Sequence, residues 1–240
     1  MKKIKYYGKR KGIRDIWWNA FMVKNCRKWC NGDIPECPTA KVEIPTDLLT
    51  WTEAVKIHNK MKKSYKNYKY DAYICFYLDD YKFDGLHGIW NDYHKAIEII
   101  RHFAGIISPD FSTYKDFPIP LKVWNTYRMR TFGFWCATQG INVINNVRWS
   151  PDIIDICFKG IPKNSVICLG VVASDLRHSE NWPEYEYYLK KMVRELKPKI
   201  ILVYGSSRYK FFKDLQKQGI VIKSYQTARN RKKATAGDTK

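Results

Sequence analysis

Between residues 71 and 225, short apolar runs alternate with longer segments whose apolar residues recur every three or four positions. This alternation predicts an α/β fold: a mainly parallel sheet of about six strands with helices between them, either an open sheet or a partial barrel. The expected strands lie at residues 73–78, 105–108, 141–147, 165–172, 199–204 and 220–225. The expected helices lie at residues 91–103, 118–139, 183–197 and 207–218, and a further one begins at Thr50 or Thr52.

Polar side chains follow several of these apolar runs. The carboxyl ends of parallel strands share one edge of a sheet, so these side chains are expected to converge on a crevice there. Asn125 and Arg128 lie three residues apart on the helix expected at 118–139, so they are expected to share a face and point into the same crevice. Arg128 and Arg148 are suited to hold a phosphate or carboxylate, and Asp110 is suited to act as a base or metal ligand. The open alternatives are a turn-capping aspartate and a structural ion pair between Asp110 and Arg148. The candidate catalytic residues are Asp110, Asn125, Arg128, Asn145 and Arg148.

The chain is strongly basic, with 43 Lys and Arg against 23 Asp and Glu and a net charge of +20. Residues 1–70 hold 17 basic and 6 acidic side chains, whereas residues 226–240 hold 5 and 1. Acidic and basic side chains are nearly balanced in the middle of the chain. We therefore expect a basic, Cys-bearing N-terminal extension (1–70), an α/β domain (71–225) and a flexible basic tail (226–240). A net charge of this size favours a polyanionic partner, and nucleic acid is the first candidate. A generally Lys-rich composition is the alternative.

Lysines and tyrosines alternate from Lys60 to Tyr70, a pattern typical of surfaces that follow a phosphate backbone and stack on bases. The alternative is a solvated helix face and a linker whose tyrosines pack on the next domain. The residues expected to contact DNA or RNA are Lys2, Lys3, Lys9, Arg10, Lys11, Arg14, Lys60, Lys63, Lys66, Arg229, Arg231 and Lys232.

Three of the seven cysteines lie in one N-terminal loop: Cys26, Cys30 and Cys37. Three thiolates with a fourth ligand such as His58 would suit zinc, or part of an iron-sulfur cluster, and free buried thiols are the alternative. No secretory signal is expected, and no apolar run exceeds strand length. We therefore expect reduced cysteines, a cytoplasmic location and no membrane partner.

Several strings resemble an uncharacterised family of bacterial, phage and mobile-element proteins grouped as a domain of unknown function. They are SPDFS (108–112), WNTYR (124–128), NVRW (146–149), GIPKNS (160–165) and YGS (204–206). The resemblance covers about residues 70–215 and implies a shared fold and site without an established activity.

The motifs of phosphate-binding loops, nucleophile elbows and zinc proteases are absent from the chain. The favoured hypothesis is a nucleic-acid-binding protein of a phage or mobile element. The alternatives are an enzyme that acts on a phosphorylated or nucleotide substrate in the crevice, and an inhibitor or adaptor that binds a host protein.

Overall fold

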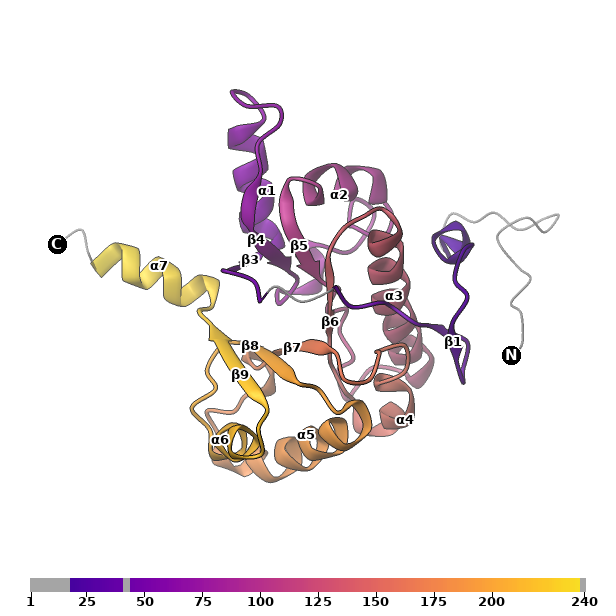
Figure 1. Ribbon diagram of the computed structural model, residues 1–240, viewed down its shortest axis with the longest axis vertical. Coiled ribbons are helices and arrows are strands. Elements are labelled where there is room, and N and C mark those ends of the chain that lie inside the picture. The colour runs from indigo at the N-terminus through magenta and orange to yellow at the C-terminus, as the bar shows by residue number, and fades with distance from the viewer. Residues whose placement is uncertain (1–17, 41–43, 238–240) are drawn as a thin grey trace.

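The computed structural model describes residues 18–40 and 44–237. Its centre is a seven-stranded parallel sheet whose strands follow one another in chain order (Figure 1). The predicted α/β fold with a mainly parallel sheet is therefore confirmed, in its curled form. The strands are β3 (Leu48–Thr50), β4 (Tyr70–Cys75), β5 (Phe103–Ile107), β6 (Val143–Asn146), β7 (Val166–Gly170), β8 (Ile200–Tyr204) and β9 (Val221–Tyr225).

Helices occupy most of the connections between these strands (Figure 1). The α-helices are α1 (Trp51–Met61), α2 (Tyr93–Ile100), α3 (Ile119–Thr138), α4 (Ile154–Cys157), α5 (Trp182–Leu196), α6 (Lys210–Lys217) and α7 (Ala228–Gly237). The short 3₁₀ helices are η1 (Ala20–Val23), η2 (Asp80–Lys82), η3 (Pro151–Ile153), η4 (Val172–Ser174) and η5 (Ser179–Asn181). The structure differs from the sequence-based expectation at β3, which was not anticipated, and at α7, which occupies part of the segment expected to be flexible.

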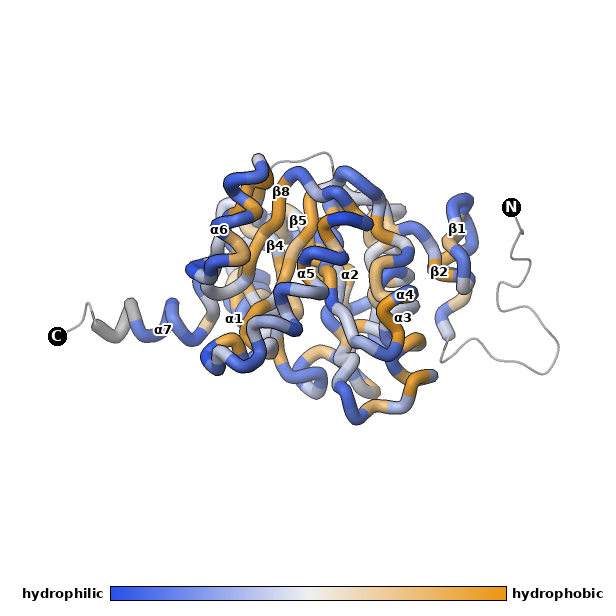
Figure 2. The backbone as a smooth tube through the Cα atoms, turned by 90° about the horizontal axis from the view of Figure 1, so that it is seen from below, coloured by the Kyte–Doolittle hydropathy of each residue, from blue (hydrophilic) through white to orange (hydrophobic). Residues whose placement is uncertain are grey.

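The sheet curls because helices cover only one of its faces. When each parallel strand pairs with the next in sequence, right-handed crossovers place all the helices on the same side. The other face must then bury its own side chains. Successive strand residues alternate accordingly: Ile106 and Val203 pack against helices, whereas Ile107 and Leu202 pack inside the curl. Figure 2 shows the strands as hydrophobic segments enclosed by helices with hydrophilic outer parts.

Side chains connect the two edge strands, β3 and β9. The Tyr225 hydroxyl donates a hydrogen bond to the carbonyl of Pro45 at 2.7 Å, and Lys223 Nζ donates to the same oxygen at 2.9 Å. Arg231 of α7 forms ion pairs with Glu53 of α1 and with Asp47, at 2.8 and 3.6 Å. These contacts bring the ends of the sheet together, so the fold is a partial barrel.

Helix α1 begins directly after β3 at a capping box. Thr50 Oγ1 accepts a hydrogen bond from the backbone N–H of Glu53, and the Glu53 carboxylate accepts one from the backbone N–H of Thr50. Thr50 is one of the two caps expected from the sequence. Its reciprocal hydrogen bonds fix the sharp turn between a three-residue strand and the helix. The Glu53 carboxylate also accepts a hydrogen bond from Arg231 Nη2 of α7.

The described part of the N-terminal extension packs on α3 and the α4 region. It contains η1 and an antiparallel hairpin of β1 (Trp29–Cys30) and β2 (Ile34–Pro35). The backbone N–H of Cys37 donates to the carbonyl of Gly160 at 2.8 Å. Gly160 has a φ of 76°, and a Cβ at this position would lie 2.4 Å from the carbonyl oxygen of Pro35. Only glycine therefore allows this close approach of the hairpin.

Alkaline pH is expected to destabilise the protein through its buried thiols. Burial raises the pKa of Cys37 and Cys168 to about 12 and that of Cys157 to about 11. The folded state therefore keeps these protons at a pH where the unfolded chain loses them, and stability falls as pH rises from about 9 toward 12. We expect a loss of about 1.5 kcal/mol per thiol between pH 8 and pH 10. Urea unfolding at pH 8 and pH 10 measures it, and equal stabilities would contradict the prediction.

Candidate functional site

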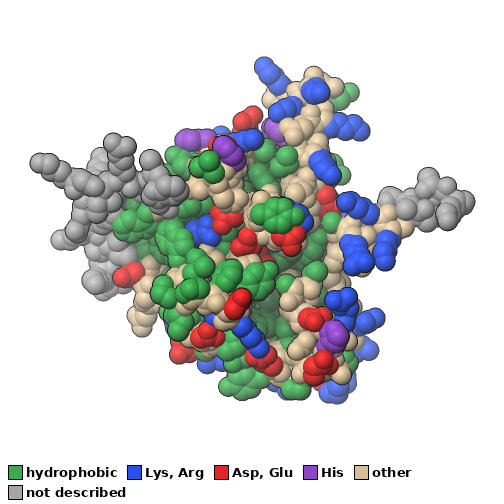
Figure 3. Space-filling model, turned by 180° about the vertical axis from the view of Figure 1, so that it is seen from behind, with side chains coloured by type: hydrophobic (Ala, Val, Ile, Leu, Met, Phe, Trp, Pro, Cys, Tyr) green, Lys and Arg blue, Asp and Glu red, His purple; other side chains and the backbone are tan. Residues whose placement is uncertain are grey.

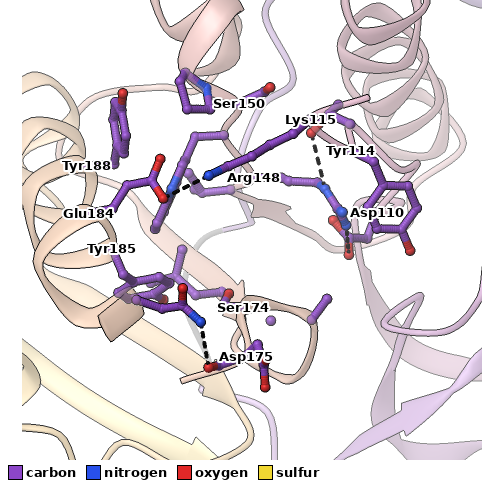
Figure 4. Close-up of a pocket in the computed structure, with 18 of the residues that line it drawn as sticks. Asp110, Tyr114, Lys115, Arg148, Ser150, Ser174, Asp175, Glu184, Tyr185 and Tyr188 are labelled. Carbon is purple, nitrogen blue, oxygen red and sulfur yellow. Dashed lines mark hydrogen bonds and ion pairs between the residues drawn. The ribbon is translucent and has the colours of Figure 1, made fainter. Parts of the chain in front are cut away.

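A cavity of about 430 Å³ opens at the carboxyl ends of β5, β6 and β7, with α5 as its far wall (Figure 4). This is the sheet edge where the sequence predicted a crevice. Each strand supplies residues from the loop that follows it, and α5 adds three large side chains. The principal lining residues are Asp110, Thr113, Tyr114 and Lys115 after β5, Arg148 and Trp149 after β6, Ser174 and Asp175 after β7, and Glu184, Tyr185 and Tyr188 from α5.

Asp110 and Arg148 form an ion pair on the wall of this cavity. Arg148 Nη1 lies 2.9 Å from Asp110 Oδ2, and Arg148 Nε donates to Thr113 Oγ1 at 3.2 Å. The Asp110 side chain is 12% exposed and the Arg148 side chain 18%, so the pair is mostly buried but still reaches the cavity. Burial opposes the charge on Arg148, but the carboxylates of Asp110 and Asp80 outweigh it and raise the pKa of Arg148 overall. The structural ion pair considered for these residues is present, and it lines the cavity.

Asn146 orients the Asp110 carboxylate from behind. Its Nδ2 donates to Asp110 Oδ1 at 2.8 Å, and its Oδ1 accepts a hydrogen bond from the Tyr77 hydroxyl at 3.0 Å. Burial raises the pKa of Tyr77 well above its ordinary value, so the phenol remains a donor. A chain of hydrogen bonds therefore runs from Tyr77 inside the barrel through Asn146 and Asp110 to Arg148 at the cavity.

Asn145, the candidate chosen from the sequence, does not line the cavity. Its Nδ2 donates to the carbonyl of Cys37 at 2.9 Å and to Thr39 Oγ1 at 3.1 Å, which ties the N-terminal segment to β6. Neighbouring residues of a strand point to opposite faces, so Asn146 and not Asn145 shares the inner face with Ile144. That alternation was the signal in the sequence that would have identified Asn146.

Asn125 and Arg128 lie in a second buried layer beneath the SPDFS loop, outside the cavity lining. Asn125 Nδ2 donates to the carbonyl of Ser112 at 2.5 Å, and Arg128 Nη2 donates to Asn125 Oδ1 at 2.7 Å. Arg128 Nη1 contacts both Asp84 oxygens at 2.9 and 2.8 Å, and its guanidinium carbon lies 3.8 Å from the centroid of the Phe111 ring. The predicted proximity of Asn125 and Arg128 is present, and it supports the loop that carries Asp110.

Both arginines expected to hold a phosphate are already paired with carboxylates, Arg148 with Asp110 and Arg128 with Asp84. The other cation lining the cavity, Lys115, pairs with Glu184 at 3.0 Å. Asp116 and Asp175 add two more carboxylates to the lining. Its charge therefore favours an uncharged or cationic group over a phosphate.

Three predicted nucleic-acid contacts lie at the end of α1 and in the segment just after it. Lys60, Lys63 and Lys66 are exposed, and none of them forms a salt bridge within the described residues. Figure 3 shows Lys and Arg side chains gathered along the edge that carries α1 and α7, with acidic side chains toward the middle of this face. The edge therefore has the charge that a polyanion requires.

A second hollow, of about 320 Å³, continues this basic surface between α1 and α2. Lys56, Lys82 and Lys95 line it, together with His87 and the single carboxylate Asp92. Lys56 and Lys60 are four residues apart, so they lie on one face of α1, and Lys63 and Lys66 follow the last residue of that helix, Met61. We call Lys56, Lys60, Lys63, Lys66, Lys82 and Lys95 the basic surface.

The C-terminal residues expected to bind nucleic acid lie on α7. Arg231 is held by Glu53 and Asp47, which anchors α7 beside α1. Arg229 and Lys232 lie on the same helix and are exposed. The N-terminal set, Lys2, Lys3, Lys9, Arg10, Lys11 and Arg14, lies outside the described residues.

The structure does not gather the three N-terminal cysteines around a common point. Cys26 Sγ donates to the carbonyl of Lys28 at 3.1 Å, Cys30 Sγ accepts from the backbone N–H of Gly160 at 3.3 Å, and Cys37 is buried beside Gly133. His58 instead lies 3.1 Å from the Tyr68 hydroxyl. Across residues 18–40 and 44–237, no three His, Cys, Asp or Glu side chains are placed to hold a metal ion. The zinc or iron-sulfur centre expected at these cysteines stays a prediction.

Comparison with known proteins relates the chain to phages. A family model described as "Domain of unknown function (DUF4417)" matches residues 26–226. The Gene 1 protein of Mycobacterium phage L5 is 31% identical over 138 residues, 57% of this chain and 58% of that protein. The Gene 1 protein of Mycobacterium phage D29 is 30% identical over 57% of this chain and 49% of that protein. The chain thus spans about half the length of these relatives.

No solved structure matches the chain. Within the described residues, no helix has both the length and the apolar character needed to cross a bilayer.

Proposed function

The chain belongs to the DUF4417 family, and on that premise we propose that it is a phage or mobile-element protein that binds nucleic acid through the basic surface. The observation that carries this proposal is the set of exposed lysines on α1 and in the segment that follows it. From residue 54 to residue 70 the chain contains Lys56, Lys60, Lys62, Lys63, Lys66 and Lys69, and no acidic residue.

The groove between α1 and α2 adds the shape that a nucleic acid backbone needs. Lys82 and Lys95 face Lys56 across this hollow, so a strand lying in it meets cations from both helices. Lys82 already pairs with Asp79, but that carboxylate is 62% exposed, and such surface pairs exchange readily for a phosphate. Neutralising several phosphates releases their counterions, which drives association at low salt.

The tyrosines of the same segment divide into two groups. Tyr65 and Tyr70 are 64% and 42% exposed, as a base-stacking role requires. Tyr68 is buried and its ring stacks on His102 at 4.2 Å, so it belongs to the core. The expectation of a base-stacking strip is therefore retained for Tyr65 and Tyr70, and the alternative of packing on the domain applies to Tyr68.

The alternative of an enzyme acting on a phosphorylated substrate has less support. Each cation lining the cavity at the strand ends is already paired, and four carboxylates line the same space.

Fluorescence anisotropy with a labelled 20-nucleotide strand and the matching duplex tests the proposal. The protein is expected to bind both at about 50 mM salt, because backbone contacts do not require a particular strand form. Failure to bind either form at this salt concentration would remove nucleic acid as the partner.

Replacing Tyr65 by Ala is expected to weaken single-strand binding and leave duplex binding within twofold. Base-aromatic stacking contributes about 1–3 kcal/mol per base, and bases in a duplex already stack on one another. The matched control is Tyr187→Ala, which removes a tyrosine that is 59% exposed on α5. Equal single-strand affinities for the two variants would show that Tyr65 does not stack on bases.

A further inference from the structure

We propose that the cavity at the carboxyl ends of β5, β6 and β7 binds a nucleobase. One unstacked base of a bound strand would enter the cavity, while the phosphates of other nucleotides of that strand contact the basic surface. The inference rests on the proposed function for the source of the base, but it concerns a different surface and a different kind of contact.

The charges of the cavity select an uncharged ligand. Arg148 and Lys115 each pair with a carboxylate, at 2.9 and 3.0 Å. Asp116 and Asp175 add two further carboxylates, of which Asp175 pairs with Arg177 outside the lining at 3.4 Å, so the lining offers carboxylates and no unpaired Lys or Arg. A phosphate in this space would meet carboxylates before it met an unpaired cation, whereas a neutral base meets no such penalty.

The walls of the cavity suit a flat ring. Tyr114 lies beside the Arg148 guanidinium, whose carbon is 5.4 Å from the ring centroid. On the opposite side Trp149 and Tyr185 pack together with their centroids 5.1 Å apart, and Tyr188 extends that wall. Figure 4 shows the labelled tyrosines surrounding the space. Aromatic side chains are the usual stacking partners of unpaired bases, and a cavity of about 430 Å³ has the size of a small-ligand site.

The polar groups of the cavity suit the edge of a base. Asp110 offers acceptor oxygens beside the donor N–H groups of Arg148, and base edges likewise place donors beside acceptors. The position of the Asp110 carboxylate is set by Asn146, whose amide orientation is set in turn by the Tyr77 hydroxyl. The site is therefore held in place before a ligand arrives.

The mouth of the cavity is crossed by the Lys115–Glu184 ion pair (Figure 4). These side chains are 73% and 48% exposed, and exposed pairs of this kind contribute little to stability. Separating Lys115 from Glu184 to admit a base therefore requires little free energy.

Isothermal titration with the free nucleosides adenosine, guanosine, cytidine and thymidine tests this inference without phosphate contacts. The wild-type protein is expected to bind at least one nucleoside with the same Kd at 50 and 300 mM salt. Ala173→Trp, which fills the cavity from its rim, is expected to weaken that binding at least tenfold. The control is Val172→Trp, because Val172 is 59% exposed and lies beside Ala173 but outside the cavity lining.

The two proposals fail separately in this design. The base site would be overturned if the wild type bound no nucleoside. It would also be overturned if Ala173→Trp left nucleoside binding unchanged, or if inorganic phosphate displaced the nucleoside. A protein that bound arginine amide but bound none of the nucleosides would also overturn the base site, and the cavity would then be assigned to a cationic partner. Salt-dependent DNA binding by both Trp variants would leave the basic surface intact in every one of these cases, and circular dichroism melts would confirm that both variants are folded.

Discussion

Replacement of Arg130 by Ala is expected to lower the free energy of unfolding by about 4 kcal/mol, the largest loss of stability we predict for one side chain. Arg130 is fully buried in α3, and its guanidinium donates to the carbonyls of Lys159, Asn146 and Cys157 at 3.0, 3.2 and 3.0 Å. The substitution leaves three buried carbonyl oxygens without donors and opens a cavity. Burial lowers the pKa of Arg130 to about 10, so the guanidinium remains charged at neutral pH.

Urea denaturation measures this loss, which corresponds to a fall in Tm of roughly 10 °C for a chain of this size. The matched control is Arg194→Ala, which removes an exposed arginine of α5 and is expected to change stability by less than about 0.5 kcal/mol. A loss below about 1 kcal/mol for Arg130→Ala would contradict the role assigned to it, because any three orphaned carbonyls cost more than that.

The triple substitution Lys60→Gln, Lys63→Gln and Lys66→Gln is expected to reduce affinity for nucleic acid by roughly several hundred-fold near 0.1 M salt. Each phosphate contact contributes about tenfold under these conditions, because its formation releases condensed counterions. The three side chains are exposed, so the fold should be unaffected. Anisotropy titrations of the labelled duplex measure the change.

A second triple variant separates local contacts from net charge. Lys191→Gln, Lys213→Gln and Lys217→Gln remove the same charge from α5 and the α6 region, on the far side of the molecule from α1 (Figure 1). This control is expected to reduce affinity only a few-fold. An equal loss in both variants would show that net charge alone drives binding and that the basic surface has no special role.

Most of the fold was predictable because buried parallel strands and amphipathic helices leave strong periodic signals. The runs expected at residues 165–172 and 199–204 correspond to β7 and β8. β3 was missed because three residues carry no measurable period, and its place in the sheet depends on pairing with β4. α7 was missed because its apolar residues show no helical stripe, and its described anchor is Arg231, which reaches carboxylates far away in the sequence.

The candidate site was predictable in its position but not in its bonding. Strand ends indicated Asp110 and Arg148, and the structure places both at one cavity. The sequence could not show that Arg128 would pair with Asp84, because that contact depends on how the loop after β4 folds against α3. The choice of Asn145 over Asn146 ignored the alternation of side chains along a strand, a local rule that was available from the sequence.

The salt dependence of DNA binding is the decisive test of nucleic-acid binding through the basic surface. The logarithm of the association constant is measured against the logarithm of salt concentration for the wild type and for the two triple variants. A steep negative slope is expected for the wild type, shallower by about 2.7 in the Lys60/Lys63/Lys66 variant and nearly unchanged in the α5/α6 control. A wild-type slope near zero, or a slope that the Lys60/Lys63/Lys66 variant leaves unchanged, would contradict nucleic acid binding through the basic surface.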